Sequence, residues 1–182
     1  MHTYRIHTIE SAPEKSKPAL QGLLQAVGII PNLAATMAES PVLLNGFVGA
    51  FGNFHGGTFS AGQKQVLLLS NAVANTCAWA VAFHSALALK EGVDAEHVRA
   101  IRERRLPEDA ELAALSRFTR ALIEARGHVS ASDLATFRAA GFGPDQVLEV
   151  IAGLAVSVMA NYAGNITHPA LETPFQSQVW KA

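Results

Sequence analysis

The side chains of this chain best suited to covalent or redox chemistry are the thiol of Cys77, its one cysteine, and the imidazole of His84. A thiolate is a strong nucleophile, and an imidazole can carry a proton near neutral pH. Asn75 or Thr76 is expected to cap a helix whose first turn contains Cys77, and the free amides of a helix start favour a thiolate. We therefore predict that the pKa of the Cys77 thiol lies below its usual value of about 8.5.

The spacing of these two residues limits what they can do together. Seven positions correspond to roughly 10 Å along a helix, so Cys77 and His84 share a face but cannot hydrogen-bond within a straight helix. Ala80 lies one turn before His84 and supplies no second thiol there. In the alternative interpretation Cys77 is a small core residue and His84 a hydrogen-bonded core histidine, because free cysteines are among the most buried residues. The sequence leaves both interpretations open.

Two consecutive helices, over about 62–74 and 77–91, are expected to position these side chains near the centre of the fold. Ser60 and Gln63 have the spacing of a capping box at the first helix start, and Gly92 provides a stop for the second.

Capping residues and glycines predict further helices around this pair, and no segment alternates apolar and polar residues as a strand does. We expect an extended arm over 1–10, an aromatic loop over 51–59, an irregular tail from Pro169, and helices over about 13–26 (capped by Ser11), from 31, from 41, 94–101, 107–127, 130–141 and from 144, the last one central. The fold class is therefore all-α, with one domain over 1–182 and a core over about 14–168.

The segment Cys77-Ala-Trp-Ala-Val-Ala-Phe-His84 resembles the Cys-x-x-Cys-x-x-x-His motif of the alkylhydroperoxidase D and carboxymuconolactone decarboxylase superfamily. Ala80 stands at the second cysteine, and Gln65 stands where redox-active members carry a glutamate. Segments similar to the longer peroxidase-related members lie at 28–33, 40–44, 86–92 and 161–165. The resemblance covers roughly 14–175 and implies a helical bundle similar to alkylhydroperoxidase D.

The resemblance also implies an activity, that of an antioxidant peroxidase. Cys77 would attack a peroxide and become a sulfenic acid, which an external thiol would reduce. His84 and Gln65 would orient groups or relay protons, and Trp79 and Ala80 would lie beside the substrate.

Two other functions remain open. One is a decarboxylase-like enzyme that acts on a small lactone or carboxylate by acid–base catalysis, for which His55, His84 and His168 are the available imidazoles. The other is a redox-inactive member with a small-molecule pocket or a structural role.

A possible internal repeat adds candidates from the second half of the chain. When the sequence is aligned with itself at a shift of 84 residues, Glu149 aligns with Gln65, Asn161 with Cys77 and His168 with His84. If the two segments are true repeats, these three residues form a polar binding cluster together with Asn165, and a buried carboxyl there would have a perturbed pKa. Pairing of Glu149 with an arginine is the simpler alternative.

Composition excludes several other classes of protein. Fourteen Lys and Arg against fifteen Asp and Glu give a net charge of −1, which offers no electrostatic basis for binding nucleic acid. We expect a soluble, cytoplasmic protein, because the apolar runs are too short or too interrupted for a membrane span of about 20 residues. A metal site is not expected, because the seven histidines include no pair at helical spacing, and no cofactor is implied.

The resemblance further implies a homo-oligomer, a trimer or hexamer. Gly46, Gly49 and Gly52 recur at three-residue spacing in the helix from 41, which indicates a close backbone contact on that face.

Overall fold

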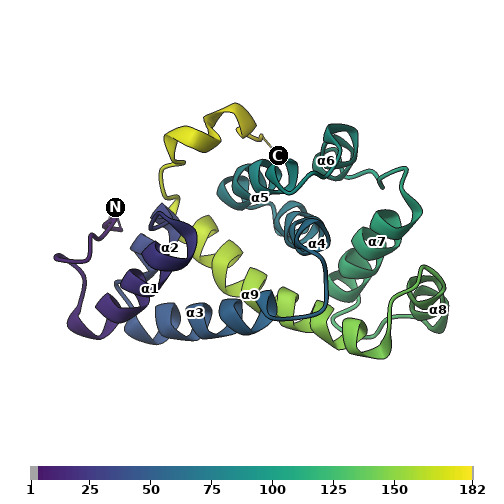
Figure 1. The fold of residues 1–182 in the computed structure, drawn as a ribbon, viewed down its shortest axis with the longest axis horizontal. Coiled ribbons are helices and arrows are strands. Elements are labelled where there is room, and N and C mark those ends of the chain that lie inside the picture. The colour runs from purple at the N-terminus through teal and green to yellow at the C-terminus, as the bar shows by residue number, and fades with distance from the viewer. Residues whose placement is uncertain (1–3, 182) are drawn as a thin grey trace.

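In a computed structural model that describes residues 4–181, the chain is all-α, with no strand among these residues (Figure 1). Residues 1–3 and 182, which belong to the expected arm and domain, lie outside the described range. The helices are α1 (Lys17–Val27), α2 (Asn32–Met37), α3 (Pro41–His55), α4 (Ala61–Ala74), α5 (Ala78–Lys90), α6 (Ala95–Arg102), α7 (Ala110–Glu124), α8 (Ala131–Ala139) and α9 (Pro144–Thr167), with 3-10 turns η1 (Glu14–Ser16) and η2 (Thr173–Gln178).

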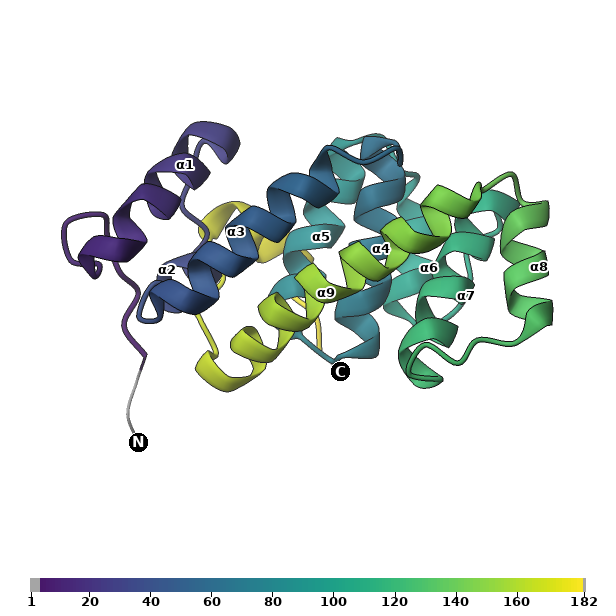
Figure 2. The same ribbon diagram turned by 90° about the horizontal axis from the view of Figure 1, so that it is seen from below.

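The pair α4 and α5 forms the centre of the molecule, as predicted. Ser60 and Gln63 make both bonds of the capping box, so α4 starts where the sequence indicated. Every residue of α4 from Lys64 to Val73 is buried, because α5, α6, α7 and α9 surround this helix. Figure 2 shows α3 and α9 side by side across one face, with α4 and α5 behind them.

The junction between α4 and α5 differs from the prediction. Asn75 ends α4 instead of starting α5, and Thr76 turns the chain with a positive φ of 54°. Cys77 is itself the residue that caps α5, so it precedes the first turn. The tight turn uses both expected capping residues, which is why the helix starts one residue later.

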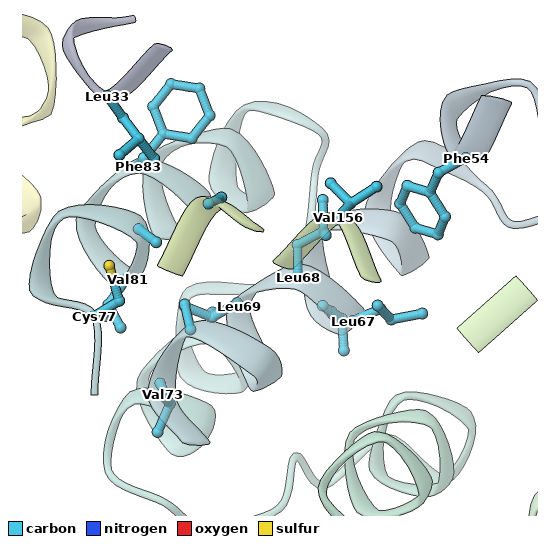
Figure 3. Close-up of a cluster of buried hydrophobic side chains, with 14 of the residues drawn as sticks. Leu33, Phe54, Leu67, Leu68, Leu69, Val73, Cys77, Val81, Phe83 and Val156 are labelled. Carbon is cyan, nitrogen blue, oxygen red and sulfur yellow. The ribbon is translucent and has the colours of Figure 1, made fainter. Parts of the chain in front are cut away.

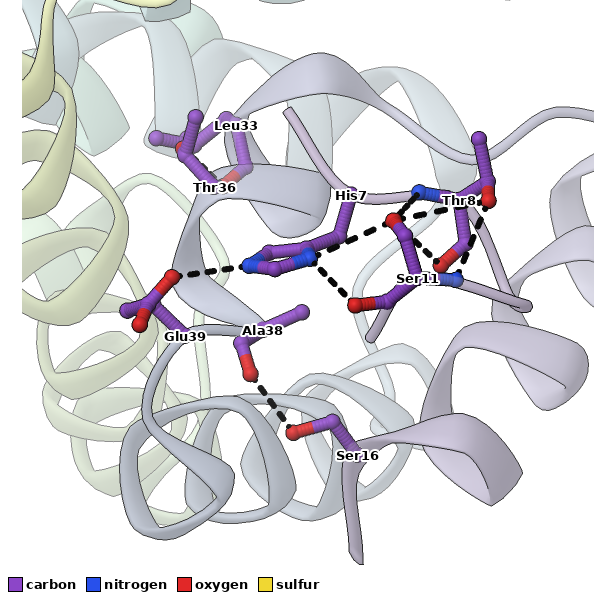
Figure 4. Close-up of polar contacts among 8 residues, drawn as sticks. All are labelled: His7, Thr8, Ser11, Ser16, Leu33, Thr36, Ala38 and Glu39. Carbon is purple, nitrogen blue, oxygen red and sulfur yellow. Dashed lines mark hydrogen bonds and ion pairs between the residues drawn. The ribbon is translucent and has the colours of Figure 1, made fainter. Parts of the chain in front are cut away.

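The predicted capping box at Ser11 was wrong, and α1 begins only at Lys17. Ser11 instead closes a turn, in which its hydroxyl accepts a hydrogen bond from the amide of Thr8 at 2.9 Å. The same turn holds the buried imidazole of His7, whose Nδ1 lies 3.0 Å from the Ser11 carbonyl and whose Nε2 lies 2.8 Å from the Glu39 carboxylate (Figure 4). These contacts fix part of the expected arm.

Helix α9 was predicted to be central, and one of its faces is buried in the bundle while the other is exposed. Its outer face leaves large apolar side chains exposed, namely Leu148 (66%), Ile151 (47%), Tyr162 (55%) and Ile166 (65%). With 24 residues it is also longer than expected and could span a bilayer by length and composition alone, a test that core helices of soluble proteins pass too.

Two further expectations need correction. Helix α3 continues through Phe51 and Phe54 to His55, so the aromatic loop is only the short link after it. The glycines of α3 make no close contact within the chain, since a Cβ at Gly46, Gly49 or Gly52 would meet nothing within 4 Å.

The tail contains η2 and is held to the bundle. Arg102 donates to the carbonyls of Gln178 and Val179, and Glu172 accepts from the amide of Asn32 at 2.6 Å and from Trp79 Nε1 at 3.1 Å. The tail therefore covers the outer side of α5.

Candidate functional site

A cavity with a volume of about 500 Å³, the large cavity, lies between α1, α3, α4, α5 and α9. Its walls are mainly apolar, with aromatic rings of Phe47, Phe51, Trp79 and Phe83. The polar side chains that reach it include Gln65, His84, His55 and Ser157. A large apolar pocket with a few convergent polar groups is typical of a small-molecule site.

The bond between Gln65 and His84 is the central polar contact of this cavity. Gln65 faces inward from α4 and is 5% exposed, and its carboxamide oxygen lies 2.9 Å from His84 Nδ1 on α5. Because that oxygen can only accept, Nδ1 carries the proton in a neutral ring and Nε2 is left as an acceptor. Nε2 has no partner among residues 4–181.

Burial keeps His84 uncharged. Loss of solvation lowers the pKa of His84 to about 3, and the nearby His55 ring acts in the same direction. The side chain is therefore a neutral hydrogen-bond acceptor at physiological pH. This agrees with the interpretation of His84 as a hydrogen-bonded histidine, although its ring also lines a cavity.

His55, in the last turn of α3, is the second imidazole of the cavity. Its ring centroid lies 4.1 Å from that of Phe51, and its Nε2 is buried with no hydrogen-bond partner among the described residues. Burial lowers the pKa of His55, and the positive charge of Lys64 lowers it further. The sequence identified His55 as an available imidazole, but it did not show that His55 and His84 would line the same cavity.

Cys77 does not line this cavity. The thiol is 1% exposed and lies in the apolar core with Val81 and Leu69 (Figure 3). A Cβ on Gly164 of α9 would lie 2.8 Å from Sγ, so the glycine makes room for the sulfur. The thiol borders a smaller cavity of about 230 Å³, together with Asn165, His168 and Trp79.

The predicted activation of the Cys77 thiol was wrong. Burial raises its pKa, although backbone amides of Ala80 and Trp79 that bond to the sulfur act in the opposite direction. The amides at the helix start are present as expected, but the loss of solvation outweighs them.

The other predicted site residues are divided between the two cavities and the core. Trp79 and Ala80 line the large cavity, and Trp79 also borders the small one. Asn161 is buried in α9, with its Nδ2 unpartnered among residues 4–181.

The expected cluster of Glu149 with Asn161, Asn165 and His168 does not form. Glu149 lies near the start of α9 and His168 at its end, nineteen positions away, which is roughly 28 Å along a helix. Within residues 4–181 Glu149 forms no ion pair with an arginine, and its carboxylate accepts a hydrogen bond from the amide of Thr58 at 2.9 Å. The segment from Gln65 to His84, with which 149–168 was aligned, is divided between α4 and α5, whereas 149–167 lies in the single helix α9. The two aligned segments are therefore not equivalent in structure.

One polar residue near the cavity, Lys64, was not predicted from the sequence. Lys64 is only 8% exposed, and its Nζ donates to the carbonyl oxygens of His55 at 2.8 Å and Gly57 at 3.1 Å. A lysine between Gln63 and Gln65, directly before the apolar run of α4 and next to the capping box, was the available signal. Among residues 4–181 no group of three or more His, Cys, Asp or Glu side chains is arranged to hold a metal ion.

Comparison with known proteins gives a family match to part of the chain and a shared fold for nearly all of it. Residues 41–123 match the model of the carboxymuconolactone decarboxylase family, and no functionally curated protein matches the chain. The fold is similar to an alkylhydroperoxidase AhpD core, a peroxidase-related protein from Ralstonia eutropha JMP134, at a TM-score of 0.82 and 17% identity over 98% of this chain and 97% of that one.

Two further solved structures share this fold. One is a peroxidase-related protein from Silicibacter sp. TM1040, with a TM-score of 0.77 and 16% identity over 96% of this chain and 93% of that one. The other is a cysteine-to-alanine variant of the debrominase Bmp8 in complex with 2,3,4-tribromopyrrole, with a TM-score of 0.80 and 18% identity over 98% and 96% of the two chains. At such identities the likeness concerns the fold alone. The family match over residues 41–123, together with the shared fold, makes this chain similar to the alkylhydroperoxidase D-like, carboxymuconolactone decarboxylase superfamily.

Proposed function

We propose that this protein binds a small, mainly apolar molecule in the large cavity and acts on it by acid–base chemistry, not by thiol chemistry. The observation that carries the proposal is the neutral His84 ring, held by Gln65 at 2.9 Å within an apolar cavity of about 500 Å³. Gln65 holds the proton on Nδ1, so Nε2 can accept a hydrogen bond or a proton from the ligand.

The charge of the cavity restricts the ligand to an uncharged or weakly acidic molecule. Burial lowers the pKa of both His55 and His84, so neither ring supplies a positive charge at neutral pH. The ammonium of Lys64 is bound by two backbone carbonyls. Lys90 also lines the cavity, but it is exposed and lies next to Glu91. An anionic ligand beside the imidazoles would lose its solvation without a buried cation to match it, whereas a lactone, an enol or a phenol would not.

A general base with a pKa of about 3 is weak, which limits the chemistry of the unliganded site. His84 would therefore act best as a hydrogen-bond acceptor for the hydroxyl of an enol or a phenol, and it would take the proton itself only where a bound ligand raises the pKa of the ring. The unpartnered Nε2 of His55 would contact a second polar group of the ligand.

A peroxidase with a single cysteine is the second candidate. The small cavity beside Cys77 supports it, because a volume of about 230 Å³ accommodates a hydroperoxide next to the thiol, with His168 at the same cavity. An external thiol would have to reduce the sulfenic acid. The raised pKa and 1% exposure of Cys77 weigh against this function.

Calorimetric titration with 2-naphthol and with 2-methylnaphthalene tests the proposed function. The two probes have nearly the same shape, but only the naphthol has a hydroxyl that can donate to His84. We expect 2-naphthol to bind roughly five- to tenfold more tightly, the value of about one net hydrogen bond. His84→Leu should abolish this preference, while the control His128→Leu, at an exposed histidine, should retain it.

Equal affinities for the two probes in the wild-type protein would contradict a ligand site organised by His84. Rapid, thiol-dependent peroxide turnover that Cys77→Ser abolishes would favour the second candidate instead.

A further inference from the structure

The segment 55–58, which joins the end of α3 to the link before α4, is held from both sides by charged side chains that bond to its backbone. Lys64 reaches it from α4 and donates to the carbonyl oxygens of His55 and Gly57, at 2.8 and 3.1 Å. These carbonyls lie at the end of α3, where the helix leaves carbonyl groups without a helical partner. A buried ammonium on such carbonyls is stabilised by their partial negative charge.

Glu149 holds the same link from the α9 side. Its carboxylate oxygens accept from the amide of Thr58 at 2.9 and 3.1 Å, and the Thr58 hydroxyl donates to it at 3.3 Å. A Cβ on Gly57 would lie 2.7 Å from the carboxylate, so the glycine allows this approach. The Lys64 ammonium thus donates to carbonyl oxygens and the Glu149 carboxylate accepts from an amide, and hydrogen bonds with one charged partner are the stronger kind.

From this geometry we propose that Lys64 and Glu149 are positioning residues for His55, which fix its imidazole in the large cavity. Lys64 binds the carbonyl of His55 itself, and Glu149 fixes the link three residues further on. The role assigned to His55 as a ligand contact rests on the proposed function, but the effect of Lys64 on the His55 ring does not.

Lys64 also acts on the charge of His55. Lys64 on α4 and His84 on α5 are the groups that act on the ring, and Glu149 on α9 faces the link. Lys90 and Glu91 also line the large cavity, but both are exposed. Burial and the Lys64 ammonium both disfavour a second proton on His55. His55 therefore keeps a free lone pair at neutral pH, as an acceptor in the cavity must.

The test is an NMR titration of the His55 ring in the full-length protein and in Lys64→Met, Lys64→Arg and the control Lys15→Met at an exposed lysine. We expect the midpoint of His55 to rise by roughly half to one pH unit in Lys64→Met, because the charge is gone. Lys64→Arg should restore the wild-type midpoint, and Lys15→Met should not change it. A residue that only supports the fold would leave this midpoint unchanged in a folded variant.

Glu149→Ala and Glu149→Gln provide a second measurement if Lys64→Met does not fold. Hydrogen exchange at the Thr58 amide should be roughly tenfold faster in Glu149→Ala, and the 2-naphthol affinity should fall, with partial recovery of both in Glu149→Gln. Unchanged titration of His55 in a folded Lys64→Met, or unchanged Thr58 exchange in Glu149→Ala, would overturn the proposal. A shifted His55 midpoint in a protein that binds neither naphthalene probe would support the positioning role and contradict the proposed function.

Discussion

His84 makes the stability of the protein depend on pH. Its pKa is about 3 in the folded state and has the ordinary value of about 6.5 in the unfolded chain, so the unfolded chain binds the extra proton between these values. The free energy of unfolding should not depend on this group above pH 6.5 and should fall by up to about 1.4 kcal/mol per pH unit as the pH decreases toward 3. His55, whose pKa is also lowered, acts in the same direction.

Urea unfolding at pH 7, 6 and 5 measures this dependence. His84→Gln, which keeps a polar side chain but cannot titrate, should lose stability less steeply than the wild type in this range. Parallel slopes for the two proteins would show that His84 is not held neutral.

Cys77 should be unreactive in the folded protein. Its thiol is 1% exposed and burial raises its pKa, so both access and thiolate content are reduced. We expect alkylation by iodoacetamide at pH 8 to be slower by roughly tenfold or more than in the same protein unfolded in urea. A rate equal to that of the unfolded chain would indicate an accessible thiolate and would restore the peroxidase as the leading candidate.

At the scale of elements, the contact between α5 and α9 depends on Gly164. Gly164→Ala would bring a Cβ to 2.8 Å from Cys77 Sγ, and such overpacking costs about 1–3 kcal/mol. Cys77→Ala in the same chain should recover part of that loss, because it removes the sulfur. In contrast, Gly49→Ala in α3, where a Cβ meets nothing, should stabilise the protein by up to about 1 kcal/mol.

Chemical unfolding of the wild type, the three single variants and the Gly164→Ala, Cys77→Ala double variant measures these differences. Additive effects of Gly164→Ala and Cys77→Ala would mean that the two residues are not coupled, contrary to the contact described.

The starts of several helices could be predicted from the sequence because capping is local. Ser40, Ser60, Asp94 and Ser130 each bond to an amide in the first turn of the expected helix. Ser11 has the same type and spacing, but the turn with His7 and Glu39 competes for it through tertiary contacts. Local pattern therefore predicts a cap only where no distant partner intervenes.

The candidate site was predictable only in part, for the same reason. The motif resemblance identified Gln65, Ala80 and His84, which do line one cavity. The direction of the Cys77 side chain depends on how closely α9 approaches α5, which the periodicity of either helix does not show. The role of Lys64 depends on a link that folds back over α4.

At the scale of the whole molecule, the exposed apolar face of α9 indicates association. Leu148, Ile151, Tyr162 and Ile166 lie on this face, and large exposed apolar patches are rare on monomers. We propose that the face is buried between copies of the chain, consistent with the expected trimer or hexamer. Sedimentation should give a multiple of 19.3 kDa, and Ile166→Lys should reduce it, whereas Val179→Lys, at another exposed apolar residue, should not. A mass of 19.3 kDa at micromolar wild-type protein would contradict the proposal.

The most direct test of the acid–base site is the tautomer of His84, which ¹⁵N NMR of the imidazole ring reports. The bond from Nδ1 to Gln65 predicts a neutral ring with its proton on Nδ1 at pH 7 and a free Nε2. Addition of 2-naphthol should shift the Nε2 resonance toward a hydrogen-bonded value, and 2-methylnaphthalene should leave it unchanged. A ring protonated on Nε2, or an Nε2 resonance that does not respond to 2-naphthol, would contradict the account.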